Sequence, residues 1–226
     1  MPRLSSAQRR KEILQAALRV IQRDGVQGAT TRAVVAEANM PLASFHYVFR
    51  SRDAMIRDLI VYIIEGEEHA ATATLSEGGD IRGVVRAGLQ SYFELVTAEP
   101  NREQALFELF HYSLRHPELS SLARIQYDAY HHLAAALLIT GGKQVRVHWQ
   151  IPVEALARVL VTFTDGITLA WLADRDDRAA GITMDIAADT IARYAAPLGE
   201  KTPGENTRRT TNPTPVGLGR SKENVA

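Results

Sequence analysis

The sequence lacks cysteine, long apolar runs and the marks of a secreted protein. Its 226 residues contain no cysteine, which excludes disulfides, thiolate catalysis and cysteine-ligated zinc. No uninterrupted apolar stretch approaches the roughly 18 residues that a membrane span needs. The first residues, MPRLSSAQRRKEIL, lack the apolar centre of a signal peptide. We therefore expect a cytoplasmic protein that does not insert into a membrane.

Signatures of catalysis are also missing. TGGK at residues 140–143 supplies two glycines and a lysine but not the spacing of a phosphate-binding loop, and no serine lies at a nucleophile elbow. His131 and His132 are adjacent, and adjacent side chains on a helix diverge by about 100°. This pair does not form a metal site by itself. We expect no catalytic residue, no metal and no cofactor, so the chain does not read as an enzyme.

What the sequence does contain is an uneven distribution of charge. Over the whole chain 26 basic residues balance 26 acidic ones. Residues 1–56 nevertheless carry nine basic and four acidic side chains, whereas residues 57–198 carry 12 basic and 19 acidic ones. A basic segment of this kind favours a polyanionic partner such as nucleic acid. A solvated basic surface without a partner is the alternative.

The basic segment has the pattern of a helix-turn-helix. Residues 5–24 place apolar side chains on one helical face, and Gly25 is suited to end that helix. Thr30 can cap a second helix, and Asn39, which readily adopts positive φ, can end it. Pro41 suits the first position of a third helix because its φ is preset and it lacks an N–H. Two short helices joined by a tight turn are therefore expected.

The third helix divides into an inward and an outward face. Phe45 and Phe49, spaced i, i+4, would pack inward with Val48. Small or polar side chains on the outward face would permit close approach to a DNA groove. The outward face and its margins carry Leu42, Ala43, Ser44, His46 and Tyr47. Arg50 and Arg52 follow, and we expect both to contact phosphates. For His46 and Tyr47 the alternative is that they merely close over a small core.

The rest of the chain predicts a helical body. Apolar periodicity indicates helices over residues 53–75, 80–98, 101–115, 118–139, 152–173 and 183–197, separated by glycine, proline and charged segments. QVRVHW at residues 144–149 is the nearest approach to a strand. Residues 199–226 hold three prolines and four glycines among mostly polar residues, which is typical of disorder. The fold class predicted for the chain is all-α.

TTRAVVAEANMPLASFHYVFRSRDAMI, with the upstream RKEILQAALRVIQRDGVQGAT, resembles the helix-turn-helix of the TetR family of bacterial transcriptional repressors. An alanine-rich second helix, a small-residue third helix that ends in aromatics and the run Arg-Ser-Arg-Asp carry the likeness. Three positions depart from the family pattern. Asn39 replaces the usual turn glycine, Pro41 replaces the Ser or Thr that opens the third helix, and His46 replaces the Tyr that touches the DNA backbone. Tyr47 stands beside His46 and can take that contact.

The resemblance implies a helix-turn-helix domain over residues 1–52, a helical ligand-binding and dimerisation domain over 53–198 and a disordered tail over 199–226. It implies a homodimeric repressor that binds a near-palindromic double-stranded operator and is released by a small-molecule effector. The residues expected to bind DNA are Thr30, Thr31, Arg32, Pro41, Leu42, Ala43, Ser44, His46, Tyr47 and Arg52. The alternative is an all-α small-molecule-binding or interaction protein without operator activity.

The resemblance places an effector cavity among the middle helices and the dimer interface on the last two. Ring-bearing side chains supply the candidate effector lining, namely Phe107, Phe110, His111, Tyr127, Tyr130 and His131. Aromatic stripes at helical spacing are also typical of plain core, which is the alternative. Such walls favour a mostly apolar effector with one or two polar groups, because they could not offset the desolvation of a highly charged one. The candidate interface residues are Leu156, Leu160, Phe163, Ile167 and Trp171.

Overall fold

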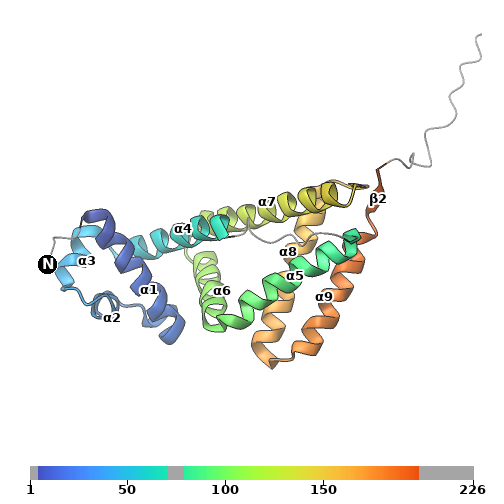
Figure 1. Cartoon of the computed structure of the whole chain (residues 1–226). Helices are drawn as coiled ribbons and strands as arrows, with labels where there is room; N and C mark the ends of the chain where they lie inside the picture. Colours follow the sequence, from blue (N-terminus) through green and yellow to red (C-terminus); the bar gives the residue numbers. More distant parts are fainter. Residues whose placement is uncertain (1–4, 71–78, 199–226) are drawn as a thin grey trace, which may run out of the picture.

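The computed structural model describes residues 5–70 and 79–198, except for the side chains of residues 65–70. The tail predicted over residues 199–226 lies outside the described residues. The described part is all-α apart from one pair of short strands (Figure 1). Its elements are α1 (Ser6–Gly28), α2 (Thr31–Glu37), α3 (Leu42–Val48), α4 (Arg52–Ala70), α5 (Ile81–Ala98), α6 (Pro100–Arg115), α7 (Ser120–Gln144), β1 (Val147–Trp149), α8 (Val153–Asp174), α9 (Asp177–Ala192) and β2 (Ala195–Pro197).

Helix α1 is fixed at both ends by local sequence. At its start, Ser5 and Gln8 form a capping box in which each side chain accepts a hydrogen bond from the other residue's backbone N–H. Near its end, Gly25 adopts a positive φ of 72°. The helix does not stop there as predicted, because it resumes after this kink and continues to Gly28.

The turn between α2 and α3 has the predicted conformation. The Thr30 hydroxyl accepts a hydrogen bond of 3.2 Å from the Ala33 N–H and so caps α2. Asn39 lies in the left-handed region with a φ of 52°. Pro41 has a φ of −69° and a ψ of 151°, so it precedes α3 as the cap residue instead of occupying the first helical position. The helix-turn-helix is confirmed, with its third helix one residue shorter at the start.

Two hydrophobic cores organise the molecule. The first joins α1, α2 and α3 to α4, α6 and the start of α7, with Phe45, Ile56 and Leu106 among its members. The second lies among α5, α7, α8 and α9. The first core therefore runs without a break across the proposed domain boundary at residue 52. A shift of α4 or α6 would reach the helix-turn-helix through direct packing.

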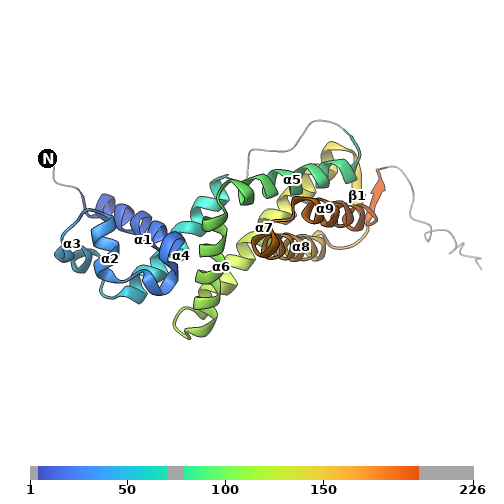
Figure 2. The ribbon, with the colours of Figure 1, turned by 90° about the horizontal axis from the view of Figure 1, so that it is seen from below.

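The body extends away from the helix-turn-helix (Figure 1). Helices α8 and α9 lie side by side at the far end of the molecule (Figure 2). There α7 packs against α8, and α5 packs against α9. We call α1, α2 and α3 the head. Helix α6 lies nearer the head and packs against α1. It connects the head with the rest of the body, as does α4, which packs against both α1 and α7.

The last helix and the strands differ from the sequence prediction. Helix α9 begins at residue 177, because the Asp176 side chain caps it by accepting a hydrogen bond of 2.9 Å from the Ala179 N–H. Residues 195–197, predicted to end that helix, instead form β2, which pairs antiparallel with β1 at residues 147–149. The last three residues of QVRVHW therefore do form a strand, and its partner β2 lies much later in the chain.

The glycine pair of TGGK was predicted to break a helix but lies inside α7. A Cβ atom on Gly141 would lie 2.9 Å from Cγ1 of Val84 in α5. A Cβ atom on Gly142 would lie 3.2 Å from Nε1 of Trp149. These glycines permit close packing at the end of α7, and this gain outweighs their low helix propensity.

Helix α8 is long and apolar enough, by length and composition alone, to cross a membrane, with a mean hydropathy of 1.4 over its most apolar window. The sequence prediction had found no such segment. One such helix is weak evidence for a membrane span, and in the structure α8 packs against α7 and α9. Only 33% of that window is buried, so an apolar face of α8 remains uncovered in the protomer.

Candidate functional site

The side chains of α3 separate into a buried and an exposed set. Phe45 and Phe49 are 0% and 2% exposed, and their ring centroids lie 5.4 Å apart. Tyr47 is 69% exposed and Leu42 is 39% exposed. The other candidates on or beside this helix are exposed or half-buried, namely Pro41, Ala43, Ser44 and His46. The inward aromatic pair thus anchors α3 and presents the predicted DNA-contacting set to solvent.

The outward face of α3 borders basic side chains of α1. The Arg9 guanidinium lies over the Tyr47 ring, 5.2 Å from its centroid. Sequence reasoning did not include Arg9 among the DNA contacts, although the run RRK at residues 9–11 carried the signal. On the other side of α3 the three candidates at the start of α2 are exposed or half-buried, namely Thr30, Thr31 and Arg32.

Arg52 has partners inside the protein. Its Nε donates a hydrogen bond of 2.9 Å to the carbonyl of Ala29, and its Nη2 donates to the carbonyl of Val26. Its Nη1 donates to the hydroxyl of Tyr112 in α6 at 3.0 Å, and that hydroxyl donates to Asp53 at 3.1 Å. The guanidinium thus closes the end of α1 onto α6. Most of the donors that were predicted to hold a phosphate are used here.

A second contact ties α6 to the same turn of α1. Oε2 of Glu108 accepts a hydrogen bond of 2.8 Å from the Val26 N–H. A Cβ atom on Gly25 would lie 3.0 Å from the same oxygen, so glycine is needed both for the positive φ and for this approach. Val26 therefore has its N–H held by Glu108 and its carbonyl held by Arg52. We call the contacts of Val26 with Glu108 and Arg52 the clasp. Sequence reasoning missed it, because Val26 and Glu108 are 82 residues apart.

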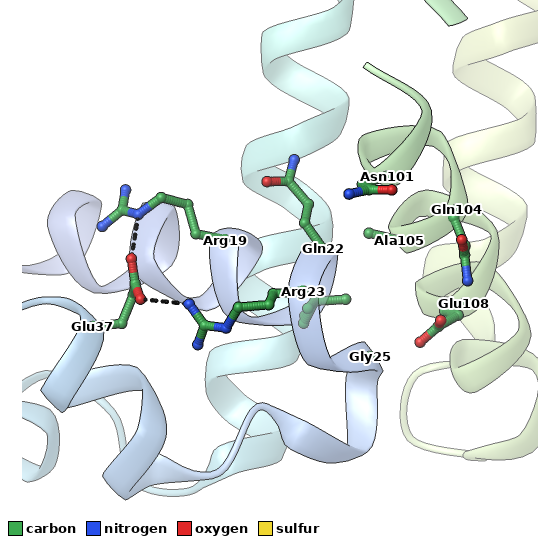
Figure 3. A pocket seen from close by; sticks show the side chains of 10 residues that line it. Arg19, Gln22, Arg23, Gly25, Glu37, Asn101, Gln104, Ala105 and Glu108 are labelled. Carbon is green, nitrogen blue, oxygen red and sulfur yellow. Dashed lines mark hydrogen bonds and ion pairs between the residues drawn. The ribbon is translucent and has the colours of Figure 1, made fainter. Parts of the chain in front are cut away.

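A polar cleft of about 570 Å³ opens beside the clasp, between α1 and α6 (Figure 3). On the α2 side, Glu37 accepts hydrogen bonds from Arg19 at 2.8 Å and from Arg23 at 3.0 Å. These hydrogen bonds lower the pKa of the Glu37 carboxyl, with the two positive charges acting in the same direction. On the α6 side Asn101, Gln104 and Glu108 line it (Figure 3). The cleft opens beside the packed contact of α1 with α6, so its width would change whenever α6 moves relative to α1.

The structure brings most of the predicted effector lining together. Phe110 of α6 and Tyr127 of α7 lie with ring centroids 4.8 Å apart. Tyr127 is also 5.9 Å from Tyr130 and 5.9 Å from His131. All four rings are half-buried. We call Phe110, Tyr127, Tyr130 and His131 the aromatic cluster. It joins α6, the helix of the clasp, to α7.

The two other candidates lie at the margin of the aromatic cluster. His111 is exposed, with its ring centroid 5.8 Å from that of Phe110. Phe107 is half-buried, and among the described residues no ring contact joins it to the cluster. The described residues also hold no group of three or more His, Asp or Glu that could bind a metal ion.

An acidic residue that sequence reasoning missed completes the aromatic cluster. The Tyr127 hydroxyl donates a hydrogen bond of 2.5 Å to Oδ2 of Asp165 in α8. Burial raises the pKa of the Asp165 carboxyl, and the Tyr127 hydrogen bond and nearby His131 only partly oppose this. Burial likewise raises the pKa of Tyr127 and lowers that of His131. The available signal was a lone acid within the apolar run VTFTDGITLAWL.

The predicted interface residues divide between core and surface. Leu156, Ile167 and Trp171 are buried within the protomer at 0%, 3% and 7% exposure, and Leu160 and Phe163 are half-buried. Large apolar side chains that the prediction did not name are exposed on the same two helices, namely Val159 and Leu169 on α8 and Ile182 and Ile186 on α9. Single exposed apolar residues are common, but here two adjoining helices each carry two of them.

Two family models match the chain. Residues 13–59 match the model of bacterial regulatory proteins of the tetR family. Residues 81–196, just over half of the chain, match the C-terminal domain of BetI-type transcriptional repressors.

Several individual proteins are similar to this chain in sequence or fold. The HTH-type nicotine-responsive transcriptional repressor HdnoR of Paenarthrobacter nicotinovorans is 27% identical over 175 residues, which are 77% of this chain and 89% of that protein. The multidrug binding protein EbrR, in its complex with imidazole, is 27% identical with a TM-score of 0.60 over 81% of this chain and 89% of its own. A transcriptional regulator from Rhodococcus sp. Rha1, 19% identical, shares the fold with a TM-score of 0.66 over 82% of this chain and 97% of its own.

The matched segments account for both parts of the molecule. The tetR model covers the helix-turn-helix and the start of α4, and the BetI-type model covers α5 to β2. The chain therefore belongs to the TetR family of bacterial transcriptional repressors, non-enzymatic DNA-binding regulators with a ligand-responsive C-terminal domain.

Proposed function

We propose that the protein is a homodimeric cytoplasmic repressor that reads its operator with the outward face of α3. The observation that carries this proposal is the division of α3, in which Phe45 and Phe49 are buried while Leu42 and Tyr47 are exposed. An exposed helix face with small side chains, next to basic residues of α1, suits the major groove. Ser44 and Leu42 would face bases, and Tyr47 with Arg9 would face phosphates.

The proposed dimer rests on α8 and α9. Their exposed apolar side chains, Val159, Leu169, Ile182 and Ile186, would be covered by the same patch of a second protomer related by two-fold symmetry. Two heads would then meet the two halves of a palindromic operator. In this arrangement Leu156, Ile167 and Trp171 support the interface from the protomer core.

The proposed effector site is the aromatic cluster. HdnoR is named for its response to nicotine, and EbrR has been crystallised with ethidium and with proflavin. Flat ring compounds of this kind suit half-buried Phe and Tyr side chains. We infer that this chain also responds to a small aromatic effector with one or two polar groups.

The effector would act on DNA binding through α6. Phe110 in the aromatic cluster and Glu108 in the clasp are two residues apart on that helix, and Tyr112 follows two residues later. A ligand that moves Phe110 would shift α6, and α6 would pull on the end of α1 through Val26. Release then depends on the difference between the ligand's affinities for the DNA-bound and the released conformations.

Two measurements test this proposal. The first is a shift assay with DNA from upstream of the protein's own gene, where saturable and specific binding is expected. The second is a thermal-shift screen of aromatic compounds, followed by operator titration with each hit. The variant Phe110→Ala should change the response to a hit and leave ligand-free DNA binding nearly intact. Specific ligand binding with no affinity for DNA would instead favour the alternative of an all-α ligand-binding or interaction protein.

A further inference from the structure

Asp165 is an unusual residue for its position. It is the only charged residue of α8 between Arg158 and Asp174, within the most apolar helix of the described chain. Its carboxylate is half-buried and accepts the hydroxyl hydrogen bond of Tyr127. A carboxylate that is withdrawn from water costs free energy unless a positive charge or several donors compensate it.

No Lys or Arg among the described residues pairs with this carboxylate. Within the described residues Asp165 forms no ion pair, whereas Arg19, Arg23, Arg82 and Arg86 each do. The charge of His131 acts on Asp165, but burial together with the charge of Arg158 lowers the pKa of His131. The imidazole is thereby held toward its neutral form. One hydrogen bond from Tyr127 is left to stabilise the carboxylate.

The surroundings of Asp165 favour one kind of positive charge. The Tyr127 hydroxyl that meets the carboxylate belongs to a ring packed against Phe110, Tyr130 and His131, and the faces of Phe and Tyr rings attract organic cations. A hydrated metal ion would need several oxygen or imidazole ligands, and no such group exists among the described residues. A flat organic cation could stack on a ring and place its charge at the carboxylate.

We propose that the aromatic cluster with Asp165 is a binding site for a monocationic aromatic compound, whose positive charge pairs with the Asp165 carboxylate. This inference rests on the proposed function and narrows its effector class. It is compatible with the expected effector, mostly apolar with one or two polar groups, because Asp165 offers a partner for a single positive charge. The site is reachable because Phe110, Tyr127, Tyr130 and His131 all retain partial exposure.

Entry of the ligand would rearrange contacts that the structure shows. The ring would take the place of one partner in the Phe110 and Tyr127 contact, which is 4.8 Å between centroids and leaves no room for a third ring. Phe110 lies on α6 and Tyr127 on α7, so insertion would separate these helices. A cation that binds beside Asp165 would therefore push α6 away from α7.

A charge-matched pair of probes tests the proposal. 1-Methylquinolinium is a permanent cation, and quinoline is a ring of nearly the same shape that is mostly uncharged at neutral pH. Isothermal titration with the full chain should show the cation binding at least about tenfold more tightly than quinoline. In Asp165→Asn, which keeps the shape and an acceptor for Tyr127, that preference should disappear while quinoline affinity stays the same. Glu154→Gln removes an exposed carboxylate at the start of α8 and should leave the preference intact.

A second variant separates the role of the Asp165 charge from that of the Tyr127 hydrogen bond. Tyr127→Phe removes the hydroxyl donor but leaves the carboxylate, so it should retain the preference for the cation. Equal affinity for both probes, binding of neither probe, or full cation preference in Asp165→Asn would each overturn the proposal. Operator binding by ligand-free Asp165→Asn is measured alongside. If that binding is normal while the cation preference fails, the repressor assignment stands and only the ligand class is wrong.

Discussion

Glu108 and Val26, 82 residues apart in the chain, are joined by a hydrogen bond of 2.8 Å between a carboxylate of α6 and a backbone N–H at the end of α1. Arg52 holds the carbonyl of the same Val26 and also reaches Tyr112 of α6. The last turn of α1 is thus attached to α6 by two independent side chains. The clasp therefore joins the body directly to the head by hydrogen bonds.

Removing the Glu108 carboxylate should weaken the protein and uncouple its two parts. Glu108→Ala leaves the part-buried Val26 N–H without its acceptor, which should lower the free energy of unfolding by about 1–3 kcal/mol. Glu108→Gln keeps a carbonyl acceptor and should lose less. Thermal denaturation measures the first effect, and the ratio of operator affinities with and without a ligand measures the coupling. Wild-type stability and coupling in Glu108→Ala would show that the clasp carries neither.

Arg50 and Arg52 form a matched pair for the phosphate contacts. Arg50 is exposed, so Arg50→Ala should lower the slope of log affinity against log salt by about 0.9 per lost contact in each subunit, with little change in melting temperature. Arg52→Ala should instead lower the melting temperature, because the carbonyls of Val26 and Ala29 lose the guanidinium donor and Val26 keeps only the hydrogen bond from the Ala29 N–H. Salt-dependent titration and calorimetry of both variants separate the two roles. A normal melting temperature with a reduced slope in Arg52→Ala would return Arg52 to the phosphate contacts first predicted for it.

The head could be predicted from sequence because its signals are local. Thr30, Asn39 and Pro41 act within a few residues of their own backbone, and Phe45 with Phe49 follow helical spacing. The clasp could not be predicted, because Glu108 and Val26 meet only through the tertiary fold. The ends of α7 and α9 were misjudged for the same reason, since Gly141 is tolerated by its packing against α5 and not by any local preference.

The candidate effector and interface residues illustrate a second limit. Periodicity placed Leu156 and Ile167 on an apolar helix but could not say which face meets the core and which meets a partner. Of the five named residues Leu156, Ile167 and Trp171 are buried in the protomer, and the exposed Ile182 and Ile186 on α9 were not considered. Asp165 was passed over because a single acid in a helix usually faces water, and only the fold brings Tyr127 to it.

The dimer proposal predicts different outcomes for exposed and buried positions on α9. Ile186 is 54% exposed, so Ile186→Glu should yield folded monomers that bind operator poorly. Ile191 is 0% exposed, so Ile191→Glu should lower the melting temperature sharply. Val61→Glu, at a 37% exposed position on α4, is the control and should leave the dimer intact. Sedimentation velocity distinguishes these species, and a wild-type monomer at micromolar concentration would count against the dimer.

The stability of Asp165→Asn should depend on pH in a defined direction. Burial raises the pKa of Asp165 above its unfolded value, so the folded protein favours the protonated acid and loses stability as pH rises through that pKa. The amide carries no charge at any pH. Asp165→Asn should therefore melt at a higher temperature than the wild type at neutral pH, and the difference should shrink as the pH falls below the ordinary range of aspartate. A variant that melts lower at neutral pH would show that the carboxylate is stabilised by the fold.

The central claim is that α3 of this TetR-family protein reads an operator, and titration of DNA from upstream of the protein's own gene tests it most directly. Fluorescence anisotropy with a labelled duplex should show saturable binding by an even number of protomers per site. Tyr47→Ala should weaken this binding at an unchanged melting temperature, since Tyr47 is 69% exposed. A shuffled duplex of equal length should bind far more weakly at the same salt concentration. Equal affinity for the two duplexes, unaffected by Tyr47→Ala, would contradict the account.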